Sequence, residues 1–327
     1  IIMDKLVSFS LPLMISGILQ LMFNAVDVIV VGRFAGSQAL AAVGSTTALI
    51  NMFVNLFMGI SLGTNVLAAR FFAAGKDRQM SETVHTSIAF AAISGIVMVF
   101  VGIFFSKFAL ELMATPADVI EQSTLYMRIY FLGMPFFMLY NYGAAILRAV
   151  GDTKRPLIFL IISGVINAVL NMILVIVFHL AVAGVAIATV FSQMISCILV
   201  LRCLYRSEGS YQFRFSKLML KGCYLKQIFQ VGVPAGIQST VINFSNVLLQ
   251  SSVNSFGSIA MAGYTAANNI LGFLFVSVNS VTQACMSFTS QNYGVRKWKR
   301  MDKILVDCMI LSMIVALVLG GGSYIFG

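Results

Sequence analysis

The stretch Ser16–Arg33, SGILQLMFNAVDVIVVGR, decides how this chain must fold. It belongs to an apolar segment, Leu6 to Val31, whose only ionisable residue is Asp27. About 20 largely apolar residues cross a bilayer core as a helix, so the segment predicts a membrane-spanning helix with a carboxylate inside it. An ionised side chain in that place costs roughly 2.5–3.5 kcal/mol on insertion scales, and such acids usually face the bundle interior and carry function.

Polar side chains share the helix face on which Asp27 lies. Ser16, Gln20, Asn24 and Asp27 are spaced four, four and three residues apart, which places them on one stripe of a 3.6-residue helix. We interpret this stripe as one wall of a polar cavity that binds substrate. Packing by interhelical hydrogen bonds is the alternative role for Gln20 and Asn24.

The composition is that of an all-helical integral membrane protein. Hydrophobic residues make up 59% of the 327 residues and charged residues only 10%, unlike a soluble domain. No phosphate-binding loop, zinc-protease motif or nucleophile–base pair occurs, so we expect neither an enzyme nor a cofactor. Nine spans of membrane length are expected: Leu6–Val31, Ala42–Ala69, Val84–Phe105, Met127–Leu147, Leu157–Phe178, Val182–Leu201, Ile228–Val253, Thr265–Ser290 and Ile304–Phe326.

Basic residues are concentrated on one side of these spans. Eighteen of the 21 Lys and Arg residues lie at the amino terminus or in the even-numbered connections. By the positive-inside rule these parts are cytoplasmic, which predicts a multi-pass protein of the plasma (inner) membrane with a cytoplasmic amino terminus. The net charge of +10 therefore reflects the membrane topology. We expect the protein to lie in the lipid bilayer and not to bind nucleic acid. His85, at the cytoplasmic start of the third span, is expected to be merely interfacial.

The chain contains an internal repeat with an offset of about 222 residues. LVSFSLP at Leu6–Pro12 aligns with IFQVGVP at Ile228–Pro234, and the basic patches at 76–78 and 297–299 keep nearly the same spacing. Copies separated by an even number of helices share one orientation, so the lobes should be related by a pseudo-twofold axis along the membrane normal. We expect a six-helix lobe at 1–206, a cytoplasmic linker at 207–226, and the first three helices of a second, incomplete lobe at 227–327.

Uncharged polar residues recur at membrane depth in the first lobe. Ser163, Asn167 and Asn171 share one face of the fifth span, while Asn141 and Thr189 lie in the spans before and after it. Oxygen donors around one carboxylate suit a hard monovalent cation, and equally a protonatable acid held by hydrogen bonds. Interhelical packing is again the alternative.

The second lobe lacks the acid. Asn243 and Asn246 belong to a comparable polar stripe on the seventh span, and Asn246 is the repeat counterpart of Asn24. The counterpart of Asp27 is a leucine at either offset of the repeat. Any ion site therefore belongs to the first lobe.

Prolines and aromatic residues add two further features to the spans. Pro12, Pro135 and Pro234 lie inside predicted helices, where each removes a backbone hydrogen bond, and we take Pro12 and Pro234 as candidate hinges. Aromatic faces can hold organic cations, which makes Phe137 and Tyr140 candidate substrate contacts, although most such rings only pack or face lipid.

Four segments resemble the multidrug and toxic compound extrusion (MATE) transporters, and the resemblance covers essentially the whole chain. They are Asp27–Arg33 (DVIVVGR), Leu147–Pro156 (LRAVGDTKRP), Val233–Ser239 (VPAGIQS) and Ala262–Ala267 (AGYTAA). Members of this family have twelve helices in two six-helix lobes and export organic cations in exchange for Na+ or H+. The resemblance thus implies a chain that stops after its ninth helix.

The resemblance also implies roles for individual residues. It places Asp27 on the family's first-helix acid and Pro12 on the proline that lets this helix bend. The remaining positions of the first-lobe cation site fall on Asn141, Asn167, Asn171 and Thr189. Similar transporters often carry an acid where this chain has Asn171, so a Na+ site at Asp27, Asn167 and Asn171 and a proton carried by Asp27 both stay open.

The resulting expectation is a monomeric secondary antiporter that exports small organic cations by alternating access of its two lobes. The first alternative is a flippase for lipid-linked oligosaccharides, which would need a groove lined by Arg and Lys. The second is a fragment that transports nothing by itself. A receptor is disfavoured by the two-lobe repeat.

Overall fold

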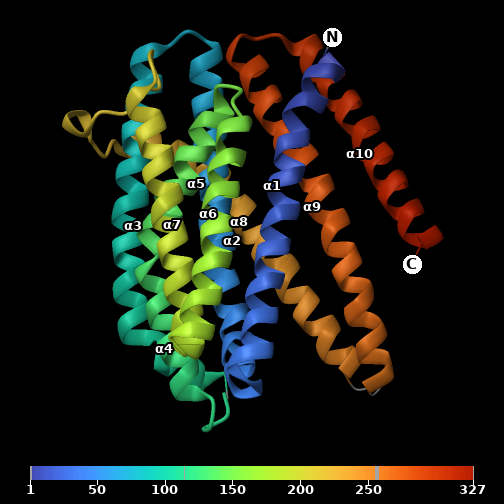
Figure 1. The fold of residues 1–327 in the computed structure, drawn as a ribbon. Coiled ribbons are helices and arrows are strands. Elements are labelled where there is room, and N and C mark those ends of the chain that lie inside the picture. Colours follow the sequence, from blue (N-terminus) through green and yellow to red (C-terminus); the bar gives the residue numbers. More distant parts are fainter. Residues whose placement is uncertain (1, 114, 255–257, 327) are drawn as a thin grey trace.

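The computed structural model describes residues 2–113, 115–254 and 258–326, and within these ranges the chain is a bundle of long helices with no strand (Figure 1). Apolar segments become helices in a membrane because a helix satisfies its backbone hydrogen bonds internally. The ten α-helices are α1 (Ile2–Val30), α2 (Ser37–Ala73), α3 (Asp77–Leu112), α4 (Ile120–Leu132), α5 (Met134–Ala149), α6 (Lys154–Met172), α7 (Ala181–Arg206), α8 (Gly222–Asn254), α9 (Ser258–Gly294) and α10 (Trp298–Phe326).

The fourth predicted span is divided into two helices. α4 and α5 meet at Gly133 with a bend of 45°. Pro135 lies in a helix as expected, but in the first turn of α5, so the expectation that it removes a backbone hydrogen bond is wrong. A proline costs no hydrogen bond there, because the first N–H groups of a helix have no intrahelical partner.

Most of the helices qualify as membrane spans by length and composition. Among the described residues, seven do so alone and the bent α4–α5 pair forms an eighth. α8 does not, because the polar residues of its stripe, such as Asn243 and Asn246, lower its hydropathy. The prediction of nine apolar spans thus overestimates the apolar character of α8, although it places a long helix there correctly.

The connections alternate between the two ends of the bundle. The amino terminus lies at the same end as the connections α2–α3, α5–α6, α7–α8 and α9–α10, at the top of Figure 1. These are the connections that hold most of the Lys and Arg residues. We call this end the basic end.

The helices of the two lobes pack on one another in a symmetric way. α2 packs against α8, and α9 packs against α1. A two-fold operation that exchanges α1 with α8 and α2 with α9 converts one of these pairings into the other. This is the arrangement that the internal repeat predicts.

Glycines let α2 and α8 approach closely. Gly59 and Gly63 on α2 meet Gly232 and Gly236 on α8, so two G-x-x-x-G patterns cross. A Cβ on Gly232 would lie 2.5 Å from Cα of Ile60. Side chains at this crossing would force the lobes apart.

The linker between the lobes is packed onto α3. Phe213 is 1% exposed, and its ring stacks on that of His85 at 5.6 Å between centroids. His85 Nδ1 donates to the carbonyl of Ser81 at 2.7 Å, and its Nε2 accepts from the backbone N–H of Arg214 at 3.1 Å. The expectation of a merely interfacial His85 is therefore wrong, because this side chain is buried and anchors the linker.

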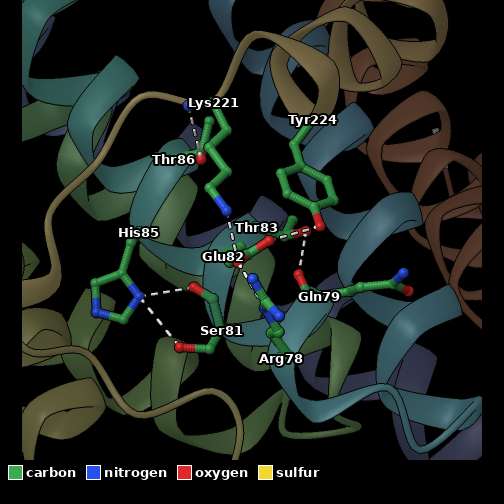
Figure 2. A network of polar contacts seen from close by, with 9 residues as sticks. All are labelled: Arg78, Gln79, Ser81, Glu82, Thr83, His85, Thr86, Lys221 and Tyr224. Atoms are coloured by element: carbon green, nitrogen blue, oxygen red, sulfur yellow. Dashed lines mark hydrogen bonds and ion pairs between the residues drawn. The ribbon is translucent and has the colours of Figure 1, made fainter.

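A charged network continues this anchor toward the second lobe. Figure 2 shows the Glu82 carboxylate between Lys221 at 2.6 Å, the Tyr224 hydroxyl at 2.8 Å and Arg78 at 3.2 Å. Thr86 accepts from the backbone N–H of Lys221 at 3.4 Å. α8 already begins at Gly222, inside the linker expected at 207–226, and its first turn takes part in this network.

Candidate cation-coupling site

Asp27 lies in the last turn of α1 and is joined to α6. Nδ2 of Asn171 donates a hydrogen bond to Oδ1 of Asp27, across 144 residues of sequence. Asn171 is completely buried, and Asp27 is half-buried. A hydrogen bond to a carboxylate is stronger than one between neutral groups, so this contact fixes α1 to α6 at membrane depth.

The two helices that carry this pair both change geometry immediately beyond it. α1 continues into a π-helical turn, η1 (Val31–Ala35), and α6 into another, η2 (Ile173–Val177), and the two turns are in contact. Such turns are rare and occur frequently at functional sites. They place the Asp27–Asn171 pair beside two locally widened helices.

A second hydrogen bond extends the site to α7. Asn167 lies one turn before Asn171, and its Nδ2 donates to Oγ1 of Thr189 at 3.5 Å, a long contact. Thr189 in turn donates to the carbonyl of Val185 at 3.0 Å. Four of the five predicted coupling residues thus form one polar row across α1, α6 and α7.

The fifth predicted coupling residue, Asn141, lies apart from this row. Its Nδ2 donates to the carbonyl of Phe137 at 2.8 Å within α5, and the side chain is buried. None of the hydrogen bonds found in the described part of the chain joins Asn141 to the other four residues.

The predicted substrate-cavity residues fall into two groups. Gln20 and Asn24 on α1 and Asn243 and Asn246 on α8 are all exposed.

The two aromatic candidates instead pack against the core of the first lobe. Phe137 is half-buried there, and the Tyr140 hydroxyl donates to the carbonyl of Pro156 at 3.1 Å, tying α5 to the start of α6. The structure does not bring these rings to the exposed amides.

Both predicted hinge prolines lie inside helices. Pro12 is a buried residue of α1, and Ser16 donates to its carbonyl at 2.8 Å. Pro234 lies in α8 between Gly232 and Gly236, at the crossing with α2. Each proline therefore permits a bend in a helix that packs against the other lobe.

Two tyrosines of α4 belong to the surroundings of Asp27 and were not expected from the sequence. Tyr126 and Tyr130 interact electrostatically with the Asp27 carboxylate, and their ring centroids are 6.1 Å apart. Their i, i+4 spacing indicates a shared helix face. Nothing in the sequence shows that this face comes near the end of α1.

The donor set fits a monovalent cation or a proton. Oδ1 of Asn171 is buried without a hydrogen-bond partner among the described residues, which is uncommon for a buried acceptor. A cation held beside Asp27 would give this oxygen a partner. A proton on Asp27 would do the same once the Asn171 amide turns over, because Oδ1 then accepts from the acid. No group of three His, Cys, Asp or Glu residues suited to a metal ion occurs in the described ranges.

The arrangement of helices is that of the MATE transporters. The chain aligns with a TM-score of 0.94 and 22% sequence identity to a structure described as the outward-facing conformation of a multidrug resistance MATE family transporter, over 99% of this chain and 72% of that one. The chain belongs to the MatE family, whose model matches residues 12–173 and 234–326. These two segments begin 222 residues apart, which is the offset of the internal repeat.

Sequence relatives lie in the same family of membrane transporters. The chain is 30% identical to the probable multidrug resistance protein YoeA of Bacillus subtilis, over 97% of this chain and 70% of that protein. It is 23% identical to the multidrug export protein MepA of Staphylococcus haemolyticus, over 96% of this chain and 70% of that protein. The expectations of a MATE-type, all-helical membrane protein are confirmed.

Proposed function

We propose that this chain is a secondary antiporter that exports organic cations, drugs among them, in exchange for H+ or Na+. The observation that carries the proposal is the Asp27–Asn171 pair, in which a carboxylate at membrane depth adjoins a buried acceptor that has no partner among the residues the structure describes. An acid at membrane depth is energetically costly. Acids in such places therefore usually serve ion transport. The names of the relatives, which refer to multidrug resistance and multidrug export, support the substrate class.

Ion binding at Asp27 would change the contact between α1 and α6. In the ionised state the carboxylate accepts from Asn171. A proton or a Na+ ion removes the net charge and replaces this hydrogen bond by a contact of different geometry with Asn171, so α1 can take another position relative to α6. Pro12 has no backbone N–H to donate and so permits α1 to bend. Affinity for the organic cation would fall when the site carries the coupling ion, because both are attracted by the same carboxylate.

The packing of the lobes supports alternating access. At the basic end α9 seals against α5: Nε2 of Gln291 donates to the carbonyl of Ala149 at 2.8 Å, and Ser287 donates to that of Arg148 at 3.4 Å.

Toward the other end α8 leaves the bundle (Figure 1), and its described side chains between 241 and 249 are exposed. Because the arrangement of helices matches a structure described as outward-facing with a TM-score of 0.94, we propose that this conformation is open to the outside. On this view the basic end is cytoplasmic, the surrounding bilayer is the plasma membrane, and the transporter acts as a monomer.

Efflux of a fluorescent organic cation such as ethidium, from cells expressing the protein, tests this proposal. Asn is nearly the same size as Asp but cannot ionise, so Asp27→Asn should reduce active efflux about tenfold or more while the protein still reaches the membrane. Asp302→Asn is the matched control, because Asp302 is an exposed acid on α10. Efflux by Asp27→Asn at the level of this control would overturn the proposal.

A further inference from the structure

A hollow lies between the two lobes at the basic end. Its larger part has a volume of about 710 Å³ and is bounded by the start of α1, the end of α2, the α5–α6 connection and α9. A smaller part of about 260 Å³ reaches the α9–α10 connection. The two parts share Lys5, Ala73, Phe288 and Gln291, so they adjoin each other, and we treat them together as the hollow.

Five basic side chains line this hollow, against one acid, Asp152. They are Lys5, Lys154, Arg155, Lys297 and Arg300. Arg155 is neutralised by Asp152, with Nε 3.2 Å from Oδ2. In the described ranges the other four cations have no ion pair. Asp4, beside Lys5 on α1, is not among the lining residues.

The positive-inside rule accounts for the side of the membrane on which these residues lie, but not for their convergence. At the same end Lys221 and Arg78 both pair with Glu82, and neither of them lines the hollow. The four unpaired cations instead come from both lobes, two from α1 and α6 and two from the α9–α10 region. Like charges that converge on one hollow repel one another, so an anion between them is stabilising.

Four aromatic side chains also line the hollow. Phe9 and Phe288 meet edge to face at 5.2 Å, and Phe72 meets Tyr211 at 6.2 Å. A lining that combines basic and aromatic side chains suits an amphipathic anion, and it repels an organic cation. Basic pockets between helices on the cytoplasmic side are typical binding sites for phospholipid headgroups.

We propose that this hollow binds a phosphate group, supplied by the headgroup of an anionic phospholipid of the cytoplasmic leaflet. The phosphate bridges Lys5 and Lys154 of the first lobe to Lys297 and Arg300 of the second. Because it contacts both lobes, it favours the conformation in which the basic end is closed. Free phosphate esters share this chemistry and are the competing source.

Binding is measured with the purified full chain in neutral detergent. The probes are dioctanoyl phosphatidylglycerol, dioctanoyl phosphatidylcholine and sn-glycerol 3-phosphate, and the readout is the melting temperature as a function of probe concentration. Phosphatidylglycerol should raise the melting temperature in a saturable way, and phosphatidylcholine should not. Raising the salt concentration should weaken the effect, since the rim is exposed.

Variants locate the site. Removing one charge should weaken binding about fivefold, so the double variant Lys5→Gln and Arg300→Gln should weaken it about 25-fold. The matched control is Lys217→Gln with Lys303→Gln, which removes two exposed charges outside the hollow and should change binding less than about twofold. The charge-conserving pair Lys5→Arg and Arg300→Lys should retain binding.

The proposal is overturned if phosphatidylcholine stabilises as much as phosphatidylglycerol, or if the double variant and its control bind alike. If glycerol 3-phosphate stabilises as strongly as the lipid, the phosphate site stands and its source is a free phosphate ester. The measurement is independent of what the protein exports, so its outcome is separate from the test of Asp27.

Discussion

Adding a single methyl group at Gly232 tests whether the α2–α8 crossing holds the lobes together. In Gly232→Ala, the new Cβ would lie 2.5 Å from Cα of Ile60, 2.9 Å from its carbonyl oxygen and 3.0 Å from that of Gly59. Carbon atoms in contact are normally about 3.5–4.0 Å apart, so α8 must retreat by about 1–1.5 Å. These neighbours are backbone atoms, which cannot turn aside as a flexible side chain does.

The expected cost follows from overpacking, which typically destabilises by about 1–3 kcal/mol. Alanine is also the better helix former by about 1 kcal/mol, which partly masks the clash. Gly44→Ala removes this ambiguity, because a Cβ on Gly44 meets nothing within 4 Å in the same kind of helix. Gly232→Ala should therefore be less stable than Gly44→Ala by about 1–3 kcal/mol.

Reversible unfolding by sodium dodecyl sulfate in mixed micelles gives the free energy of unfolding of both variants. If the two values agree within about 0.5 kcal/mol, the difference expected from overpacking is absent. α2 and α8 would then not be in close contact at Gly232, and the described packing of the lobes would be refuted.

Three further changes probe the coupling site, the linker and the seal at the basic end. Asn171→Asp places a second carboxylate beside Asp27, and carboxylate oxygens favour binding of a hard cation. Ethidium efflux should therefore become more dependent on external Na+. An unchanged Na+ dependence would argue against cation binding at this site. Phe213→Ala removes a side chain that is 1% exposed and should free the linker, so trypsin should cleave it at Lys217 sooner. The control is Phe215→Ala, because Phe215 is 65% exposed. Equal cleavage rates in the two variants would contradict the anchoring of the linker. Gln291→Leu leaves the Ala149 carbonyl without its donor and should lower the free energy of unfolding by about 1–3 kcal/mol, whereas unchanged stability would show that this bond is not formed.

The sequence predicts the membrane fold well because its strongest signals are long and local. Each of the nine predicted segments falls on a helix or, for the fourth, on the α4–α5 pair, and the repeat offset of 222 residues recurs in the two segments matched by the family model. Asp27 is conspicuous because a single charge interrupts an apolar segment. The i, i+4 stripe of α6 brings Asn171 to the site, since helix periodicity alone decides which side chains share a face.

Features that depend on long-range contacts were beyond the sequence. The break at Gly133 is invisible to a hydropathy pattern, which records composition but not backbone direction. A G-x-x-x-G pattern such as Gly59–Gly63 does not name its partner helix. Similarly, the contact between His85 and Arg214 joins segments 129 residues apart, and no periodicity links them.

The most direct test of the account is transport of tetraphenylphosphonium by proteoliposomes of the wild type and of Asp27→Asn, with a proton gradient and a Na+ gradient imposed separately. The account predicts that at least one gradient drives export by the wild type and that neither drives export by Asp27→Asn. Export by Asp27→Asn as fast as by the wild type under the same gradient would contradict it.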